Sequence, residues 1–114
     1  MTVARGDIAV VPFPFSDRDG RKLRPALVVS VGAGSLIVAF IGSQAGQLAP
    51  PSRVWLLPGD AEFGRTRLKQ ASLVHLDHLA TLDPALIHGR IGRIGPRMQA
   101  VIDAALRYVF SLSN

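Results

Sequence analysis

The sequence predicts a mainly β protein, a small and strongly bent barrel or half-barrel with a single C-terminal helix. Five or six short apolar segments, rich in β-branched residues, are separated by glycine, proline and polar turn residues. Only the segment that begins at Pro96 has apolar residues at helical spacing. With 114 residues the chain can bury a core of its own. We therefore expect residues 1–114 to form one domain, which a partner subunit would help to stabilise.

The first three expected strands follow one another closely. Residues 7–15 (DIAVVPFPF) are apolar on both faces, and their prolines, which cannot donate to a ladder, predict an edge or strongly bent strand. Residues 24–31 contain the run ALVV, which indicates a strand buried on both faces, with Pro25 at its first residue or on an edge. A glycine turn at 32–34 and a second apolar run at 35–41 predict a meander.

The second half of the chain is expected to be less regular. Residues 42–51 and 60–69 are predicted to be a loop and a polar, irregular segment, and residues 81–84 have turn chemistry. Further strands are expected at 53–57, 71–79 and 90–94, with one short helical turn at 84–88. Pro96 suits the first position of the helix, whose apolar face is predicted to hold Met98, Val101, Ile102, Ala105, Leu106, Val109 and Phe110.

The charge of the chain favours an anionic partner. Lysine and arginine number 13 against 8 acidic residues, which gives a net charge of +5, and most of the basic residues are arginine. The arginine guanidinium is a rigid fork that binds phosphate through two hydrogen bonds. Nucleic acid is the first partner that this charge indicates, and an acidic protein tail is the second.

Several classes of protein are excluded or disfavoured. There are no cysteines, so disulfide frameworks and cysteine-based zinc sites are ruled out, which fits a reducing cytoplasm. The N-terminus lacks the pattern of a signal peptide, and no apolar run reaches membrane-spanning length, so we expect a cytoplasmic protein without membrane contact. Only 6% of residues are aromatic, which disfavours a base-stacking platform.

Arg24 is the first residue that indicates a functional site. Pro25 favours an extended conformation for the residue before it, so the Arg24 guanidinium should be held at the mouth of a buried strand. A fixed cation at such a rim suits a phosphate-binding site. It equally suits an ordinary surface salt bridge, and the spacing alone leaves both interpretations open.

The densest polar cluster is His75-Leu76-Asp77-His78. On a regular strand His75 and Asp77 share one face and His78 points to the other, which is poor geometry for a metal, so no metal or other cofactor is expected. His75 and Asp77 could instead exchange protons near neutral pH. The alternative is that Asp77 pairs with one of the many arginines.

Two polar loops add further candidate residues. Ser43 and Gln44 follow an apolar strand and either hydrogen-bond a ligand or cap a turn. Arg18, Arg21 and Lys22 precede the Arg-Pro step and either bind the backbone of an anionic partner or form a solvated basic face. The two aspartates among them reduce the net field of this loop.

In order along the chain, GDI followed by VPFPF, then KLRPALVVS, AFIGSQ and SLVHLDHLATLD resemble the successive motifs of the MazF/PemK/Kid toxins of type II toxin–antitoxin systems. The resemblance runs from about Gly6 to the terminal helix. It implies an SH3-like, strongly bent antiparallel barrel with a C-terminal helix, a homodimer, and an antitoxin with an acidic C-terminal tail. It also implies a metal-independent, sequence-specific endoribonuclease that acts on single-stranded RNA such as mRNA and leaves 2′,3′-cyclic phosphate and 5′-OH ends.

The resemblance assigns roles to individual residues. Arg24 matches the arginine that faces the scissile phosphate, and Asp77 matches an acidic residue with a base role. His75 stands where the Kid branch has an arginine that acts as general acid. Gly42 replaces a threonine whose hydroxyl helps to hold the phosphate in many members, and Ser43 follows one position later.

The sequence therefore predicts a toxin endoribonuclease with Arg24, Asp77, His75 and Ser43 as catalytic residues. Arg18, Arg21, Lys22 and Gln44 are the predicted RNA-binding residues. The alternative is a catalytically weak or inert binding module similar to the gyrase poison CcdB, which shares this fold. Such a module would hold an acidic antitoxin tail or inhibit DNA gyrase.

Overall fold

The computed structural model describes residues 2–12, 22–43 and 48–113. Within them, six strands form one antiparallel sheet in the order β4-β5-β3-β2-β1-β6. The strands are β1 (Asp7–Pro12), β2 (Leu23–Val31), β3 (Leu36–Gly42), β4 (Arg53–Leu56), β5 (Ser72–Leu82) and β6 (Gly89–Arg93). The helices are α1 (Phe63–Thr66), the 3₁₀ turn η1 (Pro84–Leu86) and α2 (Pro96–Val109).

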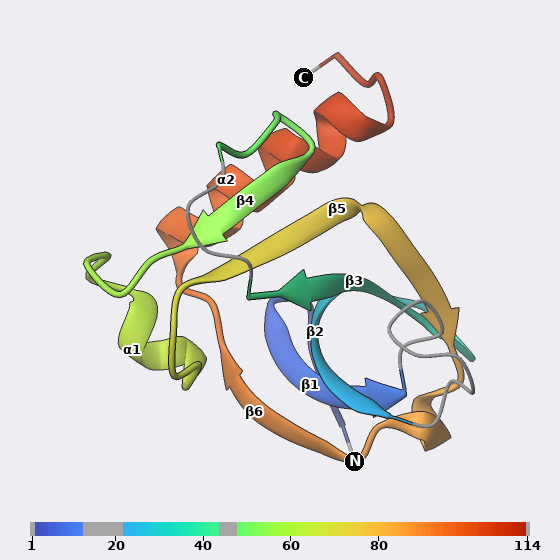
Figure 1. Cartoon of the computed structure of the whole chain (residues 1–114). Coiled ribbons are helices and arrows are strands. Elements are labelled where there is room, and N and C mark those ends of the chain that lie inside the picture. The colour runs from blue at the N-terminus through green and yellow to red at the C-terminus, as the bar shows by residue number, and fades with distance from the viewer. Residues whose placement is uncertain (1, 13–21, 44–47, 114) are drawn as a thin grey trace.

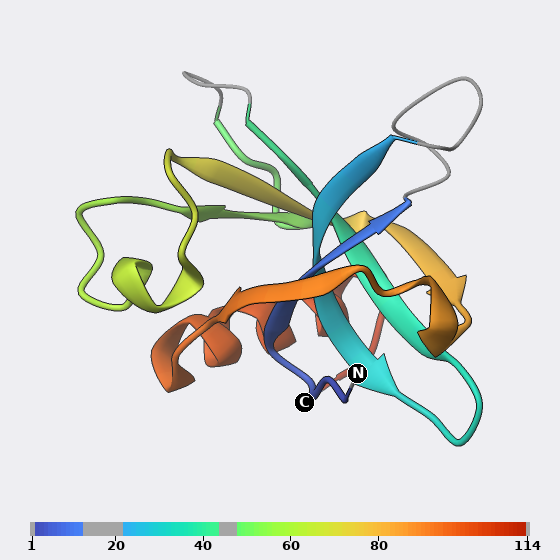
Figure 2. The ribbon, with the colours of Figure 1, turned by 90° about the horizontal axis from the view of Figure 1, so that it is seen from below.

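The sheet curls strongly, so that β1, β2, β3 and the second half of β5 form a half-barrel (Figure 1). Figure 2 shows the same curl from below, with α2 on the far side of β6. The prediction of a mainly β, strongly bent antiparallel fold with a C-terminal helix is confirmed. None of the helices in the described part of the chain is long and apolar enough to cross a membrane.

The two faces of the sheet bury two hydrophobic clusters. On one face Leu27 and Val29 of β2 pack in the cluster that α2 covers, together with Met98 and Ile102 of that helix. The other face lines the inside of the curl, where Ala26 and Val28 pack with β1 and β3 residues. The ALVV run is therefore buried on both faces, as its composition predicts.

The positions of β1 and of Pro25 differ in part from the expectation. Of the two alternatives for β1, an edge strand or a strongly bent one, the first is wrong, because β1 pairs with both β2 and β6 and the edges are β4 and β6; β1 is curved (Figure 1). Pro25 is the third residue of β2, not the first. It is tolerated because the ladder between β2 and β3 begins only at Ala26, opposite Phe40, so β2 is paired on one side alone at Pro25.

β5 is longer and less regular than predicted. It continues to Leu82, through part of the segment to which we assigned turn chemistry. Its pairing with β3 shifts from His75 opposite Phe40 to Leu79 opposite Ala39, so three residues bulge between them. The strand bends sharply there (Figure 1), and the simple alternation of faces fails because a bulge breaks the two-residue period.

Two helical segments complete the fold. Pro96 is the first residue of α2, as predicted, and Met98, Ile102 and Ala105 are its buried residues. Val101 and Phe110, which we expected on the buried face, are about half exposed. The short α1 lies in the segment predicted to be irregular, where a four-residue helix gives no periodic signal.

Candidate functional site

The register of the sheet brings Arg24 to the face that carries His75. Ala26 lies opposite Phe40 of β3, and Arg24, two residues earlier on β2 and opposite Val11 of β1, points to the same face just before the ladder with β3 begins. Phe40 in turn lies opposite His75 of β5. Paired residues of neighbouring strands point to the same face, so these side chains share the face that lines the curl.

Arg53 belongs to this face as well, because it lies opposite His75 on the other side of β5. Its guanidinium pairs with Asp77, with Nη2 3.2 Å from Oδ2 and Nε 3.2 Å from Oδ1. The alternative interpretation of Asp77, a pair with an arginine, thus describes its main contact. Arg53 was missed as a site residue because only strand pairing, and no local motif, brings it next to Asp77.

Asp77 is held as an anion by this contact. Partial burial is the largest single effect and acts to raise its pKa, but the hydrogen bonds from Arg53, a backbone hydrogen bond and the positive charges of Arg53 and His78 together hold the pKa of the carboxyl below its ordinary value. A base of low pKa accepts a proton weakly near neutral pH. The geometry therefore favours Asp77 as the residue that fixes Arg53.

His75 is buried, with 8% of its surface exposed. Its ring packs edge-on against Phe40, with centroids 5.1 Å apart, and lies 5.4 Å from the ring of His78. We predicted that His78 would point to the opposite face; the β5 bulge instead brings the two imidazoles together. Nδ1 of His75 is buried without a hydrogen-bond partner in the described part of the chain.

The surroundings of His75 favour its neutral form. Burial comes first, followed by the positive charges of Arg53 and His78, and together they lower the pKa of His75 below its ordinary value of 6.5 against the opposing effect of Asp77. A neutral imidazole at pH 7 can accept a proton or donate one hydrogen bond. It is not suited to be the resident general acid.

Gly42 leaves the approach to His75 open. A Cβ atom at this position would lie 3.3 Å from Nε2 of His75 and 3.3 Å from Cε2 of Phe40. Such contacts are tighter than side chains normally make, so a side chain at position 42 would displace the His75 ring by a few tenths of an ångström. Nε2 therefore faces the space above Gly42.

The remaining predicted residues lie at the same end of the sheet or outside the described residues. Ser43 is exposed and follows the last residue of β3, so the strand alternation that would turn it away no longer applies. Lys22 is exposed immediately before β2. Arg18, Arg21 and Gln44 lie outside the described residues. For the Arg24 guanidinium, no hydrogen bond or ion pair is found with the part of the chain that is described.

The site as a whole is cationic, and its described side chains offer few ligands for a metal ion. Arg24 and Arg53 flank a neutral imidazole, and the one carboxylate is occupied by Arg53. Among the described residues no group of three or more histidine, aspartate or glutamate side chains is arranged to hold a metal ion. Such a face is suited to a phosphodiester, whose charge increases in the transition state of its cleavage.

A small, strongly curled antiparallel sheet with a C-terminal helix is a fold known from toxins. The chain belongs to the family of PemK-like, MazF-like toxins of type II toxin–antitoxin systems, whose model matches residues 4–110. The resemblance seen in the sequence motifs is thereby confirmed. No curated protein matches the sequence.

Solved structures of low sequence identity share the fold. An endoribonuclease from a mycobacterial species, in complex with its cognate antitoxin, superposes with a TM-score of 0.75 at 18% identity, covering 99% of each chain. The Mycobacterium tuberculosis toxin MazF-mt6 gives 0.70 at 19% identity, over 95% of this chain and 99% of that one. MazF from Deinococcus radiodurans gives 0.67 at 20% identity, over 97% of both chains.

Proposed function

We propose that this toxin is a metal-independent endoribonuclease that cleaves single-stranded RNA. The observation that carries the proposal is the shared sheet face on which Arg24, Gly42 and His75 come together. An endoribonuclease and MazF toxins among the structures of the same fold support it. The net charge of +5 favours binding to a polyanion.

The proposed reaction is an attack by a ribose 2′-OH on the adjacent phosphorus. Nε2 of neutral His75 accepts the proton of the 2′-OH as the new P–O bond forms. Arg24 and Arg53 donate hydrogen bonds to the phosphorane oxygens, which carry the added negative charge. The bond to the 5′-oxygen then breaks, and that oxygen takes a proton from solvent, leaving a 2′,3′-cyclic phosphate and a 5′-OH end.

This assignment changes two of the roles that the resemblance implies. Asp77 acts as a positioning residue, because its carboxylate oxygens are engaged by Arg53. His75 acts as the base and not as the acid, because its pKa is lowered. Ser43 remains a proposed phosphate ligand at the end of β3, and Lys22, Arg18, Arg21 and Gln44 remain proposed RNA contacts.

The decisive experiment incubates the purified protein with a long single-stranded RNA in EDTA and maps the products. We expect cleavage that leaves 5′-OH ends, which a polynucleotide kinase labels without prior phosphatase treatment. Arg24→Ala should reduce the rate by about 10²-fold or more, as does the loss of one preorganised donor to a developing charge. Arg67→Ala, an exposed arginine away from this face, is the matched control.

Cleavage that requires a divalent metal, or that survives in Arg24→Ala, would contradict the proposal. The second candidate function is a binding module without nuclease activity. It is favoured by the near-complete burial of His75 and by the absence of a side-chain hydroxyl at Gly42. No cleavage of any RNA, together with inhibition of DNA gyrase by the same preparation, would establish that alternative.

The proposed partners are an acidic antitoxin and a second copy of this chain. A mycobacterial structure of the same fold contains a cognate antitoxin, and the basic charge of this chain suits an acidic tail. Co-expression with a small acidic protein from the neighbouring reading frame should yield a complex that suppresses RNA cleavage. Light scattering of the isolated protein tests the dimer.

A further inference from the structure

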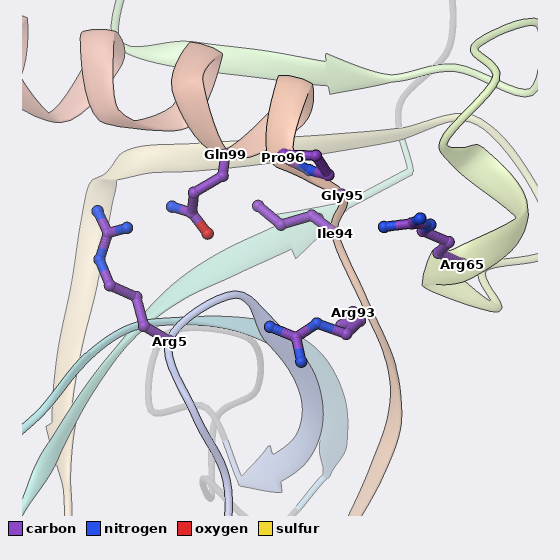
Figure 3. A pocket seen from close by; sticks show the side chains of 7 residues that line it. All are labelled: Arg5, Arg65, Arg93, Ile94, Gly95, Pro96 and Gln99. Atoms are coloured by element: carbon purple, nitrogen blue, oxygen red, sulfur yellow. The ribbon is translucent and has the colours of Figure 1, made fainter.

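A cavity of about 490 Å³ lies on a different part of the molecule, under the start of α2. Figure 3 shows three arginines around it, each from another element: Arg5 from the segment before β1, Arg65 from α1 and Arg93 from the end of β6. Its remaining lining comes from Ile94, Gly95, Pro96 and Gln99. None of the candidate catalytic residues lines it.

The cavity is separate from the face that carries Arg24. Arg93 lies opposite Asp7 at the beginning of β1, whereas Arg24 lies opposite Val11 near its end. Four residues of extended strand separate these positions by roughly 13 Å. Ile94, in the lining, belongs to the hydrophobic cluster on the α2 side of the sheet, away from the inside of the curl.

Two of the three arginines carry uncompensated charge. Arg5 pairs with Asp103 and also donates from Nε to the carbonyl oxygen of Val29, 3.1 Å away, so it is fixed and largely neutralised. For the guanidinium groups of Arg65 and Arg93, no ion pair or hydrogen bond is found with the described part of the chain. The lining therefore includes two arginine side chains without an ion-pair partner among the described residues, and the nearest carboxylate, that of Glu62, lies behind Gly95.

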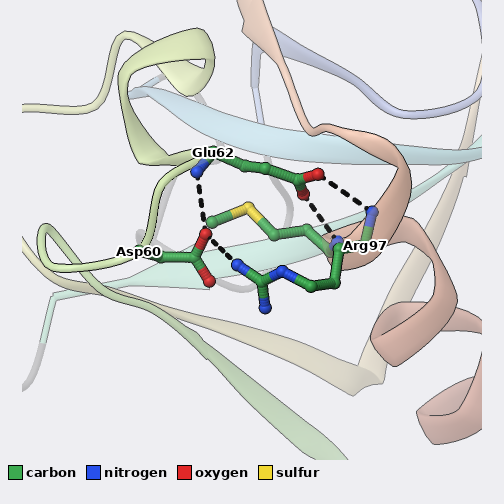
Figure 4. Close-up of polar contacts among 4 residues, drawn as sticks. Asp60, Glu62 and Arg97 are labelled. Atoms are coloured by element: carbon green, nitrogen blue, oxygen red, sulfur yellow. Dashed lines mark hydrogen bonds and ion pairs between the residues drawn. The ribbon is translucent and has the colours of Figure 1, made fainter.

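The N-terminus of α2 is not available to bind an anion in the cavity, because its backbone N–H groups already have an acceptor. The carboxylate of Glu62 accepts hydrogen bonds from the backbone N–H groups of Arg97 and Met98, at 3.0 and 2.8 Å (Figure 4). Arg97 itself pairs with Asp60. Any attraction for an anion in the cavity comes from the arginine side chains.

One wall of the cavity offers a hydrogen-bond acceptor. The Gln99 side-chain amide donates from Nε2 to Asp103, 3.0 Å away, which turns Oε1 toward Gly6. Gly6 has a φ of +93°, and a Cβ atom there would lie 2.8 Å from Oε1, so only glycine allows this close approach. The Gly-Asp opening of the chain thus shapes the cavity wall.

We propose that this cavity binds the phosphate group of a nucleotide or of an RNA end. A phosphate monoester is a dianion whose charge matches the two uncompensated arginines, and its three terminal oxygens can accept from three directions. A carboxylate, with two oxygens in one plane, is satisfied by a single guanidinium fork. The volume exceeds that of a phosphate alone and leaves room for an attached nucleoside, whose donors could meet Oε1 of Gln99.

The test is calorimetric titration of the full-length protein with pyrophosphate at about physiological salt, where nonspecific attraction is screened. We expect saturable binding that Arg65→Gln and Arg93→Gln each weaken by about tenfold or more, as expected for one charge-assisted contact. Arg67→Gln, the same charge change two residues beyond Arg65, should bind as the wild type does. Unchanged melting temperatures would show that the exposed substitutions leave the fold intact.

Two competitors identify the source of the phosphate. A short 2′-O-methyl RNA with a 5′-phosphate cannot be cleaved by 2′-OH attack, so its binding does not depend on the proposed nuclease activity. If it displaces pyrophosphate while the 5′-OH form does not, the ligand is an RNA end; displacement by a mononucleotide alone indicates a free nucleotide. Either result supports the site.

Three results would overturn the proposal. The first is the absence of pyrophosphate binding, and the second is equal weakening in Arg67→Gln, which would reflect net charge alone. The third is binding of an acidic peptide, lost in Arg107→Gln, with no binding of pyrophosphate. Arg107 lines a neighbouring cavity of about 220 Å³ with Leu106, Phe110 and Leu112, which suits a peptide.

Discussion

The absence of a side chain at Gly42 and the position of the His75 ring depend on each other. The ring is wedged against Phe40, and its Nε2 faces the space that a side chain at position 42 would enter. A threonine at position 42 would compete with the imidazole for that space.

Gly42→Ala tests this dependence. The added Cβ would lie 3.3 Å from both Nε2 of His75 and Cε2 of Phe40, so the ring must move. Because proton transfer depends on hydrogen-bond geometry, we expect RNA cleavage to fall by about tenfold or more, while stability changes by less than about 1 kcal/mol. Gly89→Ala is the control, since no atom lies within 4 Å of a Cβ there. Equal activity in both variants would contradict the close packing of His75.

The lowered pKa of His75 predicts how stability changes with pH. Burial, Arg53 and His78 lower its pKa in the folded state below the 6.5 of an unfolded chain, so between these values the unfolded state binds the proton more strongly. Stability should be highest above about pH 6.5 and fall as the pH decreases toward the folded-state pKa. Asp77, whose pKa is lowered from 3.8, loses its contribution only at more acid pH.

The measurement is the urea midpoint of unfolding between about pH 8 and about pH 5 for the wild type and for His75→Gln. His78 and His88 are present in both proteins, so the difference between the two curves isolates His75. We expect the wild type to lose stability over this range more steeply than the variant. Parallel curves would show that His75 titrates normally.

Among the elements, β6 and α1 depend on each other through Gly92. A Cβ atom at Gly92 would lie 2.5 Å from the carbonyl oxygens of Arg65 and Thr66, so the backbone of α1 rests directly on this strand. The contact sets where Arg65 leaves α1 and therefore one side of the arginine-lined cavity. A four-residue helix is too short to hold its position without such support.

Gly92→Ala should therefore destabilise the protein by about 1–3 kcal/mol, the usual cost of overpacking against atoms that cannot move freely. Chemical denaturation gives this value, with Gly89→Ala on the same strand as the matched control. We also expect Gly92→Ala to weaken pyrophosphate binding, because the backbone that carries Arg65 must shift. A variant as stable as the wild type would mean that α1 moves away at no cost.

For the whole molecule, the sequence predicted the fold well and the site only in part. The ALVV run and the helix from Pro96 carry strong periodic or β-branched signals, and both were predicted correctly. The pair of Arg53 with Asp77 and the contact of His75 with His78 follow from strand register and from a bulge in β5. Neither contact can be predicted from a local sequence pattern, because each depends on how β5 pairs with its neighbouring strands.

The arginine-lined cavity was not predicted for the same reason. Arg5, Arg65 and Arg93 are separated by 60 and 28 positions in the sequence and meet only through the pairing of β1 with β6 and the contact of α1 with β6. In the sequence of a basic chain, arginines that are far apart are most simply interpreted as solvated surface charges. Only the folded arrangement distinguishes a cluster from a background of similar residues.

The face that carries Arg24 and the arginine-lined cavity should act independently. Arg24 and Arg93 lie beside opposite ends of β1, opposite Val11 and Asp7. Arg24→Ala should abolish most RNA cleavage and leave pyrophosphate binding at the wild-type value. Arg93→Gln should do the reverse, with cleavage of a long RNA in the absence of added nucleotide changed by less than about twofold. The double variant should show the sum of the two single effects. If Arg93→Gln instead slows cleavage as strongly as Arg24→Ala does, the cavity belongs to the path of the substrate strand, and its phosphate is an internal one of the RNA being cut.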